Sequence, residues 1–178
     1  FCRTKRACQK TSDDLIERGF RAATLHGDMG QAAREKALND FKGGKSDVLI
    51  ATDVAARGID IDGITHVINY QCPEDEKTYV HRIGRTARAG AHGIALTFVD
   101  WDELARWKMI DTALHLGLPE PLETYSSSEH LYEMMKIPAG STGRMDKPRK
   151  SAPPREKSEA PTQTREKRAR VRTKKFSS

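Results

Sequence analysis

The chain has 178 residues, and its 31 Lys and Arg against 25 Asp and Glu give a formal net charge of +6. This length is enough for one domain with a substantial core, but not for two full domains and a tail. The sequence contains no run of 18 apolar residues and no basic-then-apolar segment at its amino terminus. Membrane insertion and secretion are therefore not expected.

The charge is unevenly distributed along the chain. Residues 1–137 hold 18 Lys and Arg and 21 Asp and Glu, a net of −3, whereas residues 138–178 hold 13 and 4, a net of +9. The second segment is rich in Pro, Ser, Lys and Arg with almost nothing to bury, so it is predicted to be a disordered basic tail. The folded part must therefore bind any nucleic acid through local placement of charge.

The cysteines Cys2, Cys8 and Cys72 are odd in number and show no CxxC spacing. The pattern supports neither a metal site nor a disulfide framework, and it favours a reducing, cytoplasmic setting. The first four residues are typical of the end of a β-strand, and no initiator methionine precedes them. We therefore expect this sequence to be a piece of a longer protein with a truncated first strand.

Apolar periodicity and glycine positions predict alternating helices and strands. Gly19 fits the end of the first helix, and Gly43 with Gly44 fits the end of the second. Alternation of this kind predicts an α/β fold with a parallel sheet between two layers of helices. The expected domains are residues 1–117, a short helical extension at 118–137 and the tail at 138–178. The expected helices are 5–18, 30–42, 74–83, 102–115 and 128–135, and the expected strands are 21–25, 47–51, 65–69 and 93–99.

A basic segment at residues 81–90 reads HRIGRTARAG. Arg85 and Arg88 stand three residues apart, which on a helical turn places both guanidinium groups on one side. Such a pair suits a phosphate whose charge shifts between oxygens, because guanidinium keeps its charge and offers a planar fork of donors. A solvated basic turn is the alternative interpretation of these ten residues.

A second segment, residues 51–61 (ATDVAARGIDI), follows the apolar run 48–50 directly. The order and spacing of the two segments resemble motifs V and VI of the DEAD-box RNA helicases of superfamily 2. Residues 1 to about 115 are similar to the second RecA-like domain of that family. The resemblance implies an ATP-dependent RNA helicase, with ATP and Mg²⁺ as cofactors and the metal ligands on a preceding RecA-like domain.

The resemblance also implies roles for individual residues near the nucleotide. Gly58 and Asp60 would lie near the ATP ribose and phosphates, and Arg85 and Arg88 would act as arginine fingers. His81 and Arg82 would couple the nucleotide side to the RNA side, or else be local structural hydrogen bonders. Ala87 stands where many family members have glycine, and because alanine resists positive φ we expect an ordinary helical or extended conformation there.

Polar turns follow three of the predicted strands, and a parallel sheet would place all three at one edge. Gln31 and Arg34 lie one turn apart at the start of a predicted helix, where free backbone N–H groups favour phosphate. An ordinary exposed helix face is the alternative for this pair. The resemblance implies single-stranded RNA contacts, independent of base sequence, at Arg3, Thr4, Gly27, Gln31, Arg34 and Thr52.

The sequence lacks the parts that would hold ATP by itself. Gly44-Lys45-Ser46 imitates the end of a phosphate-binding loop, but Asn39 stands where that motif needs glycine. We therefore expect this chain alone to be inactive and to act with the amino-terminal RecA-like domain of the same protein, as a monomer. Two alternatives remain: a non-catalytic RNA-binding module dominated by the tail, and a superfamily 2 DNA translocase domain.

Overall fold

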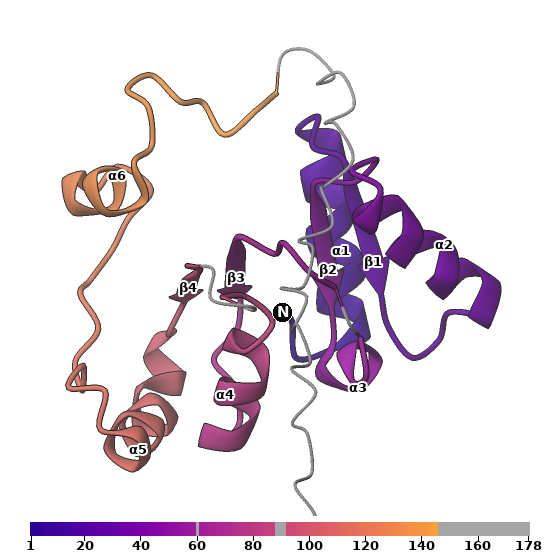
Figure 1. Ribbon diagram of the computed structural model, residues 1–178. Coiled ribbons are helices and arrows are strands. Elements are labelled where there is room, and N and C mark those ends of the chain that lie inside the picture. The colour runs from indigo at the N-terminus through magenta and orange to yellow at the C-terminus, as the bar shows by residue number, and fades with distance from the viewer. Residues whose placement is uncertain (60, 88–91, 146–178) are drawn as a thin grey trace, which may run out of the picture.

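The computed structural model describes residues 1–59, 61–87 and 92–145 of the chain. Helices and strands alternate along most of this length (Figure 1), which confirms the predicted α/β class. The elements are α1 (Lys5–Glu17), β1 (Ala22–Leu25), α2 (Gln31–Lys42), β2 (Val48–Ala51), α3 (Asp53–Ala56), β3 (His66–Asn69), α4 (Glu76–Ile83), β4 (Ile94–Thr97), a 3-10 turn η2 (Trp101–Glu103), α5 (Leu104–Leu114) and α6 (Glu129–Met135).

The strands form two parallel pairs instead of one continuous sheet. Leu25 of β1 is in register with Ala51 of β2, and Asn69 of β3 is in register with Thr97 of β4. The chain start lies between the pairs: the Cys2 N–H donates to the Ala51 carbonyl (3.0 Å), and the Tyr70 N–H donates to the Phe1 carbonyl (3.0 Å). The predicted end of a first strand is thus represented by two residues that pair with strands on both sides.

Helices α1 and α2 pack on opposite faces of the β1–β2 pair because successive side chains of a strand point to opposite faces. Ile50 is buried with Cys2 and Cys8 under α1. Leu25 and Ala51 are buried on the other face, where Leu38 of α2 packs against them. The same alternation makes both faces of β2 apolar, as expected for a strand covered on two sides.

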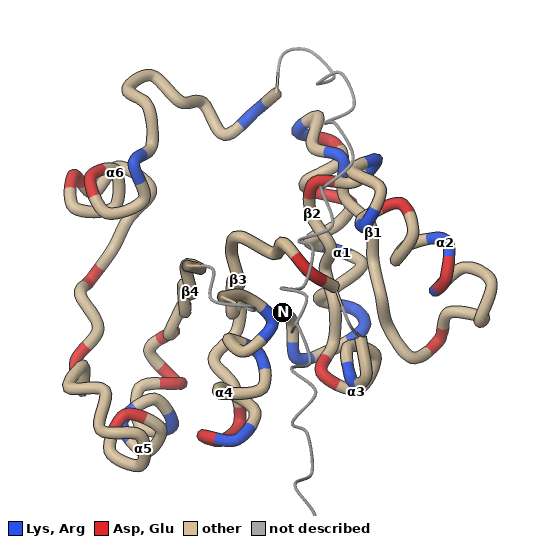
Figure 2. The backbone as a smooth tube through the Cα atoms, in the orientation of Figure 1, with Lys and Arg blue, Asp and Glu red and all other residues tan. Residues whose placement is uncertain are grey.

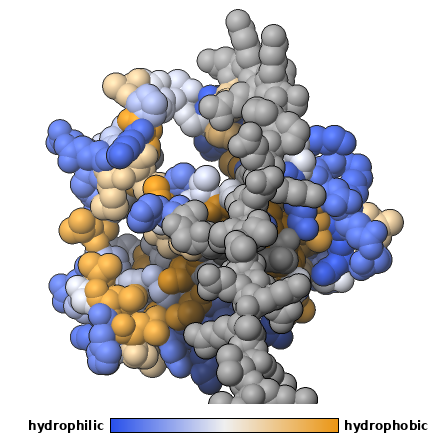
Figure 3. Space-filling view, in the orientation of Figure 1, coloured by the Kyte–Doolittle hydropathy of each residue, from blue (hydrophilic) through white to orange (hydrophobic). Residues whose placement is uncertain are grey.

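A separate cluster joins α4 to α5. Cys72, Trp107 and Ile110 are buried together, and the ring of Tyr79 meets that of Trp107 edge to face with centroids 5.8 Å apart. Burial raises the pKa of the Tyr79 hydroxyl above its ordinary value. Figure 3 shows hydrophobic residues at the surface around α5, where Met109 is exposed.

The chain beyond α5 runs away from the sheets and then returns. Leu118 is held from both sides, because its N–H donates to Asp111 (2.7 Å) and its carbonyl accepts from the Trp107 indole (2.7 Å). Helix α6 has no buried residue. Of the predicted tail, residues 138–145 are described, and the Met145 N–H donates to the Arg18 carbonyl (2.9 Å) at the end of α1. Within the described residues, no helix has the length and apolar character needed to cross a bilayer.

Candidate nucleotide and RNA site

The two marked sequence segments meet through an ion pair between Asp53 and Arg82. The Arg82 guanidinium donates to both carboxylate oxygens of Asp53, from Nε (2.7 Å) and Nη2 (2.8 Å). Its remaining nitrogen, Nη1, donates to the Gln71 carbonyl (2.9 Å) and to Asn69 Oδ1 (3.2 Å). The Arg82 side chain is only 1% exposed, so this planar fork is fully used by protein acceptors. Arg82 is therefore a structural link between α3 and α4.

The local sequence explains why these two side chains meet. Asp53 opens α3 directly after β2, and Arg82 lies in the last turn of α4, whose first turn is capped by Asp75. The Asp75 carboxylate accepts the Thr78 N–H (2.7 Å), and this hydrogen bond lowers the pKa of Asp75. The Phe1 ring lies against the Arg82 guanidinium at 5.4 Å from its centroid. The end of β2, the end of α4 and the chain start are thereby held together.

A small cavity of about 60 Å³ opens beside this ion pair. Arg57, Thr78, His81 and Arg85 line it together with the paired residues. Among the described residues, neither Arg57 nor Arg85 forms an ion pair with a carboxylate. Figure 2 shows basic positions gathered where α3, α4 and the amino terminus meet. The cavity is therefore suited to an anionic group.

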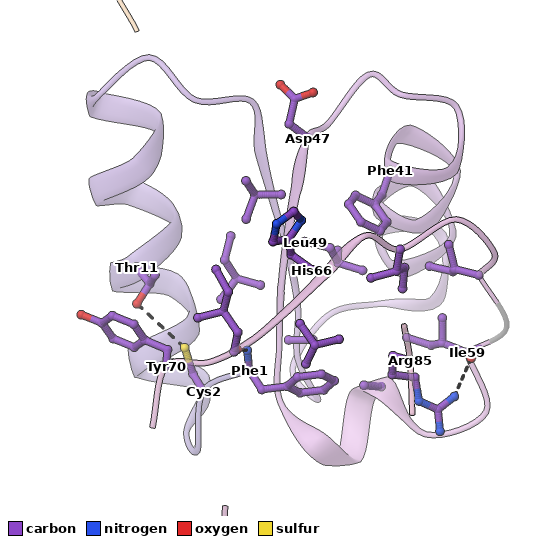
Figure 4. A pocket seen from close by; sticks show the side chains of 18 of the residues that line it. Phe1, Cys2, Thr11, Phe41, Asp47, Leu49, Ile59, His66, Tyr70 and Arg85 are labelled. Atoms are coloured by element: carbon purple, nitrogen blue, oxygen red, sulfur yellow. Dashed lines mark hydrogen bonds between the residues drawn. The ribbon is translucent and has the colours of Figure 1, made fainter. Parts of the chain in front are cut away.

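Arg85 is held by backbone carbonyls from two segments. Its Nη1 donates to the Ile59 carbonyl (2.8 Å), drawn in Figure 4, and its Nε donates to the His81 carbonyl (3.3 Å). Gly58, the neighbour of Ile59, has φ +72°, a conformation that disfavours side chains. Arg85 thus contacts the loop that the resemblance assigns to the nucleotide. Asp60 and Arg88, which belong to the same expectation, lie outside the described residues.

The expectation for Ala87 was wrong. Ala87 has φ +55°, in the left-handed region, and α4 already ends at Ile83. The cause is tertiary: the Thr86 hydroxyl donates to the Ile64 carbonyl, and Gly93 lies so close to the Thr86 side chain that a Cβ at Gly93 would clash with it. The helical turn of α4 therefore does not continue through Arg85 to Ala87.

Several predicted RNA contacts lie after strand ends that are aligned with one another. Leu25 and Ala51 are paired in register, so Gly27 and Thr52 follow the same edge, and Thr4 follows Cys2, which pairs with Ala51. Gly27 is exposed and nothing would contact a side chain there, whereas Thr52 is buried. Thr4 caps α1 by accepting the Ala7 N–H (3.1 Å). The predicted arrangement of polar turns along one edge is therefore present.

Two more of the predicted RNA residues lie on the first turns of α2. Gln31 donates to Glu35 (2.7 Å), one turn along the exposed face of the helix. Arg34 is half-buried and donates to the Ala55 carbonyl of α3 (3.3 Å). Arg34 therefore links the start of α2 to the segment that carries Asp53.

Arg3 is engaged by a carboxylate that the sequence interpretation missed. Its guanidinium forms an ion pair with Glu103, a buried side chain that also accepts the Cys72 N–H (3.2 Å). Glu103 completes a capping box with Asp100 at the start of η2, and the D-x-x-E spacing could have identified it. The sequence likewise predicted no role for Asp53, because its partner Arg82 lies 29 residues away in the sequence.

No metal site is formed within the described part of the chain, where no group of three or more His, Cys, Asp and Glu side chains could hold an ion. The three cysteines are free and buried. A hydrogen bond from Cys8 lowers the pKa of Cys2 to about 6, and the same contact raises the pKa of Cys8.

In this parallel α/β domain, a small basic cavity joins the end of β2 to the end of α4. The family described as the helicase conserved C-terminal domain matches residues 1–90. The chain belongs to this family, in the branch formed by the DEAD-box proteins.

Relatives of known name support this assignment. The ATP-dependent RNA helicase CshA of Listeria monocytogenes is 53% identical over 137 residues, covering 77% of this chain and 26% of that protein. CshA of Limosilactobacillus reuteri is 56% identical over 104 residues, covering 58% of this chain and 21% of that protein. The chain thus spans about a quarter or less of the length of these curated relatives.

Solved structures show the same fold. The E. coli DEAD-box protein SrmB, bound to regulator of ribonuclease activity A, aligns with a TM-score of 0.61 and 34% identity, over 71% of this chain and 78% of that one. S. cerevisiae Dbp5, bound to RNA and ADP BeF3, aligns with a TM-score of 0.62 and 35% identity, over 76% of this chain and 35% of that one. The parallel α/β fold is therefore that of RecA-like helicase domains.

Proposed function

We propose that this chain is the carboxyl-terminal half of an ATP-dependent RNA helicase. The observation that carries the proposal is the cavity in which Arg57, His81 and Arg85 surround the Asp53–Arg82 ion pair. Because Asp53 already neutralises Arg82, the guanidinium groups of Arg57 and Arg85 remain for an external anion. The Dbp5 structure, solved with RNA and ADP BeF3, supports a nucleotide as that anion.

In this proposal ATP is held mainly by an amino-terminal RecA-like domain, which also supplies the ligands of Mg²⁺. Arg85 and Arg88 act as arginine fingers toward the γ-phosphate, and Gly58 and Asp60 lie near the ribose and phosphates. Phosphoryl transfer is catalysed mainly by positioning and charge neutralisation, and a finger is typically worth about 10³ to 10⁵ in rate. That range corresponds to roughly 4 to 7 kcal/mol of barrier.

The RNA side of the proposal uses the aligned turns beside the nucleotide. Thr4, Gly27 and Thr52 would contact the sugar-phosphate backbone, together with Gln31 and Arg34 at the start of α2. Arg34 also bonds the Ala55 carbonyl, and Asp53 lies in the same short helix. RNA binding would thereby influence the segment that holds Arg82, which gives His81 and Arg82 their coupling role. Arg3 would contact RNA while its guanidinium also forms the ion pair with Glu103.

The central test replaces Arg85 and Arg88 by alanine in a two-domain protein that contains this chain. RNA-stimulated ATP hydrolysis should fall by about 10³-fold or more, because the fingers act on the transition state. Arg6→Ala is the matched control, since Arg6 is an exposed arginine on α1 away from the cavity. Hydrolysis at the parental rate in the double variant would refute the proposal.

A second test concerns the isolated chain. Because the proposal places the ATP cradle on the amino-terminal domain, residues 1–178 alone should hydrolyse no ATP with or without RNA. RNA-stimulated hydrolysis by the isolated chain would show that the ATP-binding residues do not all lie on the amino-terminal domain. The proposed setting is the cytoplasm, with the chain acting as a monomer.

One alternative is an RNA-binding module dominated by the basic tail, which the +9 charge of residues 138–178 favours. Truncation at Pro138 followed by a salt titration of RNA binding distinguishes this alternative from the proposed helicase domain. Loss of nearly all affinity together with most of the salt slope would favour the tail. A DNA translocase, the other alternative, would show hydrolysis stimulated by double-stranded DNA more than by RNA.

A further inference from the structure

The turn after β1 and the start of α1 are joined by an ion pair between two exposed side chains. The Lys5 ammonium donates to the Asp28 carboxylate (2.5 Å) across 23 residues of sequence. The Lys5 side chain is 63% exposed, and that of Asp28 is 59% exposed. The hydrogen bond from Lys5 lowers the pKa of Asp28, so the carboxylate stays ionised near neutral pH. A cation and an anion therefore face each other in water at this point.

This ion pair lies between two of the residues proposed to contact RNA. Lys5 directly follows Thr4, and Asp28 directly follows Gly27. Both segments follow strand ends that are aligned at one edge of the fold. A sugar-phosphate backbone in contact with Thr4 and Gly27 would therefore run over the Lys5–Asp28 pair.

Within the segment before α1 and its first residue, Lys5 carries the charge that an incoming phosphate can use. Arg3 is neutralised by Glu103, whose side chain is only 7% exposed, and Thr4 is uncharged and accepts the Ala7 N–H. A buried carboxylate resists exchange, because separating the pair leaves a charge inside the protein without a partner. An exposed pair adds little to stability, since water and salt screen both charges, so another anion can replace the carboxylate at small cost.

The place of Lys5 in its helix also favours an anion beside it. Lys5 is the first residue of α1, and the first turn of this helix holds no acidic residue. A cation at this position opposes the helix dipole, whose positive end lies at the amino terminus. The ammonium and the helix end therefore both attract an anion, and in the free chain the Asp28 carboxylate supplies it.

We propose that Lys5 binds a phosphate of the RNA backbone, and that Asp28 is an internal competitor that occupies Lys5 until RNA displaces it. This inference rests on the proposed function, and it adds to the RNA site a cation that the family resemblance does not assign. A strand held also by Thr4, Gly27 and Arg34 displaces the carboxylate, whereas a single phosphate ion does not. RNA binding thereby releases the connection between the turn after β1 and the start of α1.

The first test measures RNA affinity of the full chain by the fluorescence anisotropy of a labelled oligouridylate. Lys5→Gln should weaken binding about three- to tenfold at low salt, because one phosphate contact is lost. Lys36→Gln is the matched control: Lys36 pairs with Asp40 at the same 2.5 Å, within α2, and its replacement removes the same net charge. Equal affinities for the two variants would overturn the proposal.

The second test removes the competing charge with Asp28→Asn, which keeps the shape of the side chain. This variant should bind RNA about threefold more tightly, and most of the gain should vanish when Lys5 is also replaced by Gln. In the Asp28→Asn background, Lys5→Gln should reduce the slope of log affinity against log salt by about 0.7, the value for one phosphate of a single strand. If Asp28→Asn tightened binding equally with Lys5 and with Gln at position 5, the carboxylate would only repel RNA at a distance, and the proposed competition would be wrong.

A third variant, Arg34→Ala, separates failure of this inference from failure of the proposed RNA site. If Arg34→Ala weakened RNA binding while Lys5→Gln did not, the RNA edge would stand and the role of Lys5 would be refuted. If neither variant differed from the Lys36→Gln control, the RNA side of the proposed function and the role of Lys5 would both be refuted. Weaker binding in both variants, with the parental affinity kept in Lys36→Gln, is the expected result.

Discussion

Asp53 and Arg82 lie 29 residues apart in the sequence, yet two parallel hydrogen bonds of 2.7 and 2.8 Å join their side chains. The pair connects the turn after β2 with the last turn of α4. Arg85 lies two residues after the end of α4, and its guanidinium contacts the loop that continues from α3. The ion pair and the Arg85 hydrogen bond therefore both join the segment after β2 to the segment at the end of α4.

Asp53→Asn should destabilise the chain strongly. Removing the carboxylate leaves the buried Arg82 charge without its counterion, which costs about 3 kcal/mol, at the lower end of the range for buried pairs because Asp53 is partly exposed. Urea unfolding measures the change. Asp62→Asn is the control, since Asp62 is exposed. A loss below about 1 kcal/mol would mean that Asn69 and Gln71 alone satisfy Arg82.

Ala87→Gly should stabilise the chain, whereas the same change in a helix should destabilise it. Ala87 has φ +55°, and glycine relieves the strain of a Cβ in this region, with an expected gain of about 0.5 to 1 kcal/mol after the entropy of the unfolded chain is included. Ala33→Gly, on the exposed face of α2, should instead cost about 1 kcal/mol. Thermal unfolding compares them, and changes of the same sign would contradict this interpretation.

Asp75→Ala should remove the cap of α4 at a cost of about 1 kcal/mol. The Thr78 N–H lowers the pKa of Asp75 in the folded chain, so the capping contribution is complete above the ordinary pKa of 3.8 and is lost as pH falls through the folded value. The stability difference between the parent and the alanine variant should therefore shrink in acid. Asp75→Asn, which also caps, should keep its stability without this pH dependence.

Cys2 should be largely ionised near neutral pH. The hydrogen bond from Cys8 lowers its pKa to about 6, so the ultraviolet absorbance of a thiolate should titrate with a midpoint near that pH and disappear in Cys2→Ala. Cys8→Ala removes the donor and should move the midpoint toward the ordinary value of 9.0. An unchanged midpoint in Cys8→Ala would assign the shift to another group.

Local sequence patterns were enough to predict most elements of the fold. The apolar run at 48–50 became β2, and the helix predicted at 30–42 became α2, Gln31–Lys42. The short helix α3 was missed because four residues are too few to show a period. The two marked segments also sufficed to predict the family, since their order and spacing are visible without coordinates.

The sequence by itself determined which stretches form helices and strands, and that basic groups follow α4, because periodicity and capping act between near neighbours. Only the tertiary structure decided that Asp53 binds Arg82, that Glu103 engages Arg3, that Ala87 takes a left-handed conformation, and that β2 and β3 stand apart around an apolar groove. Those features arise between residues distant in sequence, where the packing of whole elements, and not local preference, selects the partner.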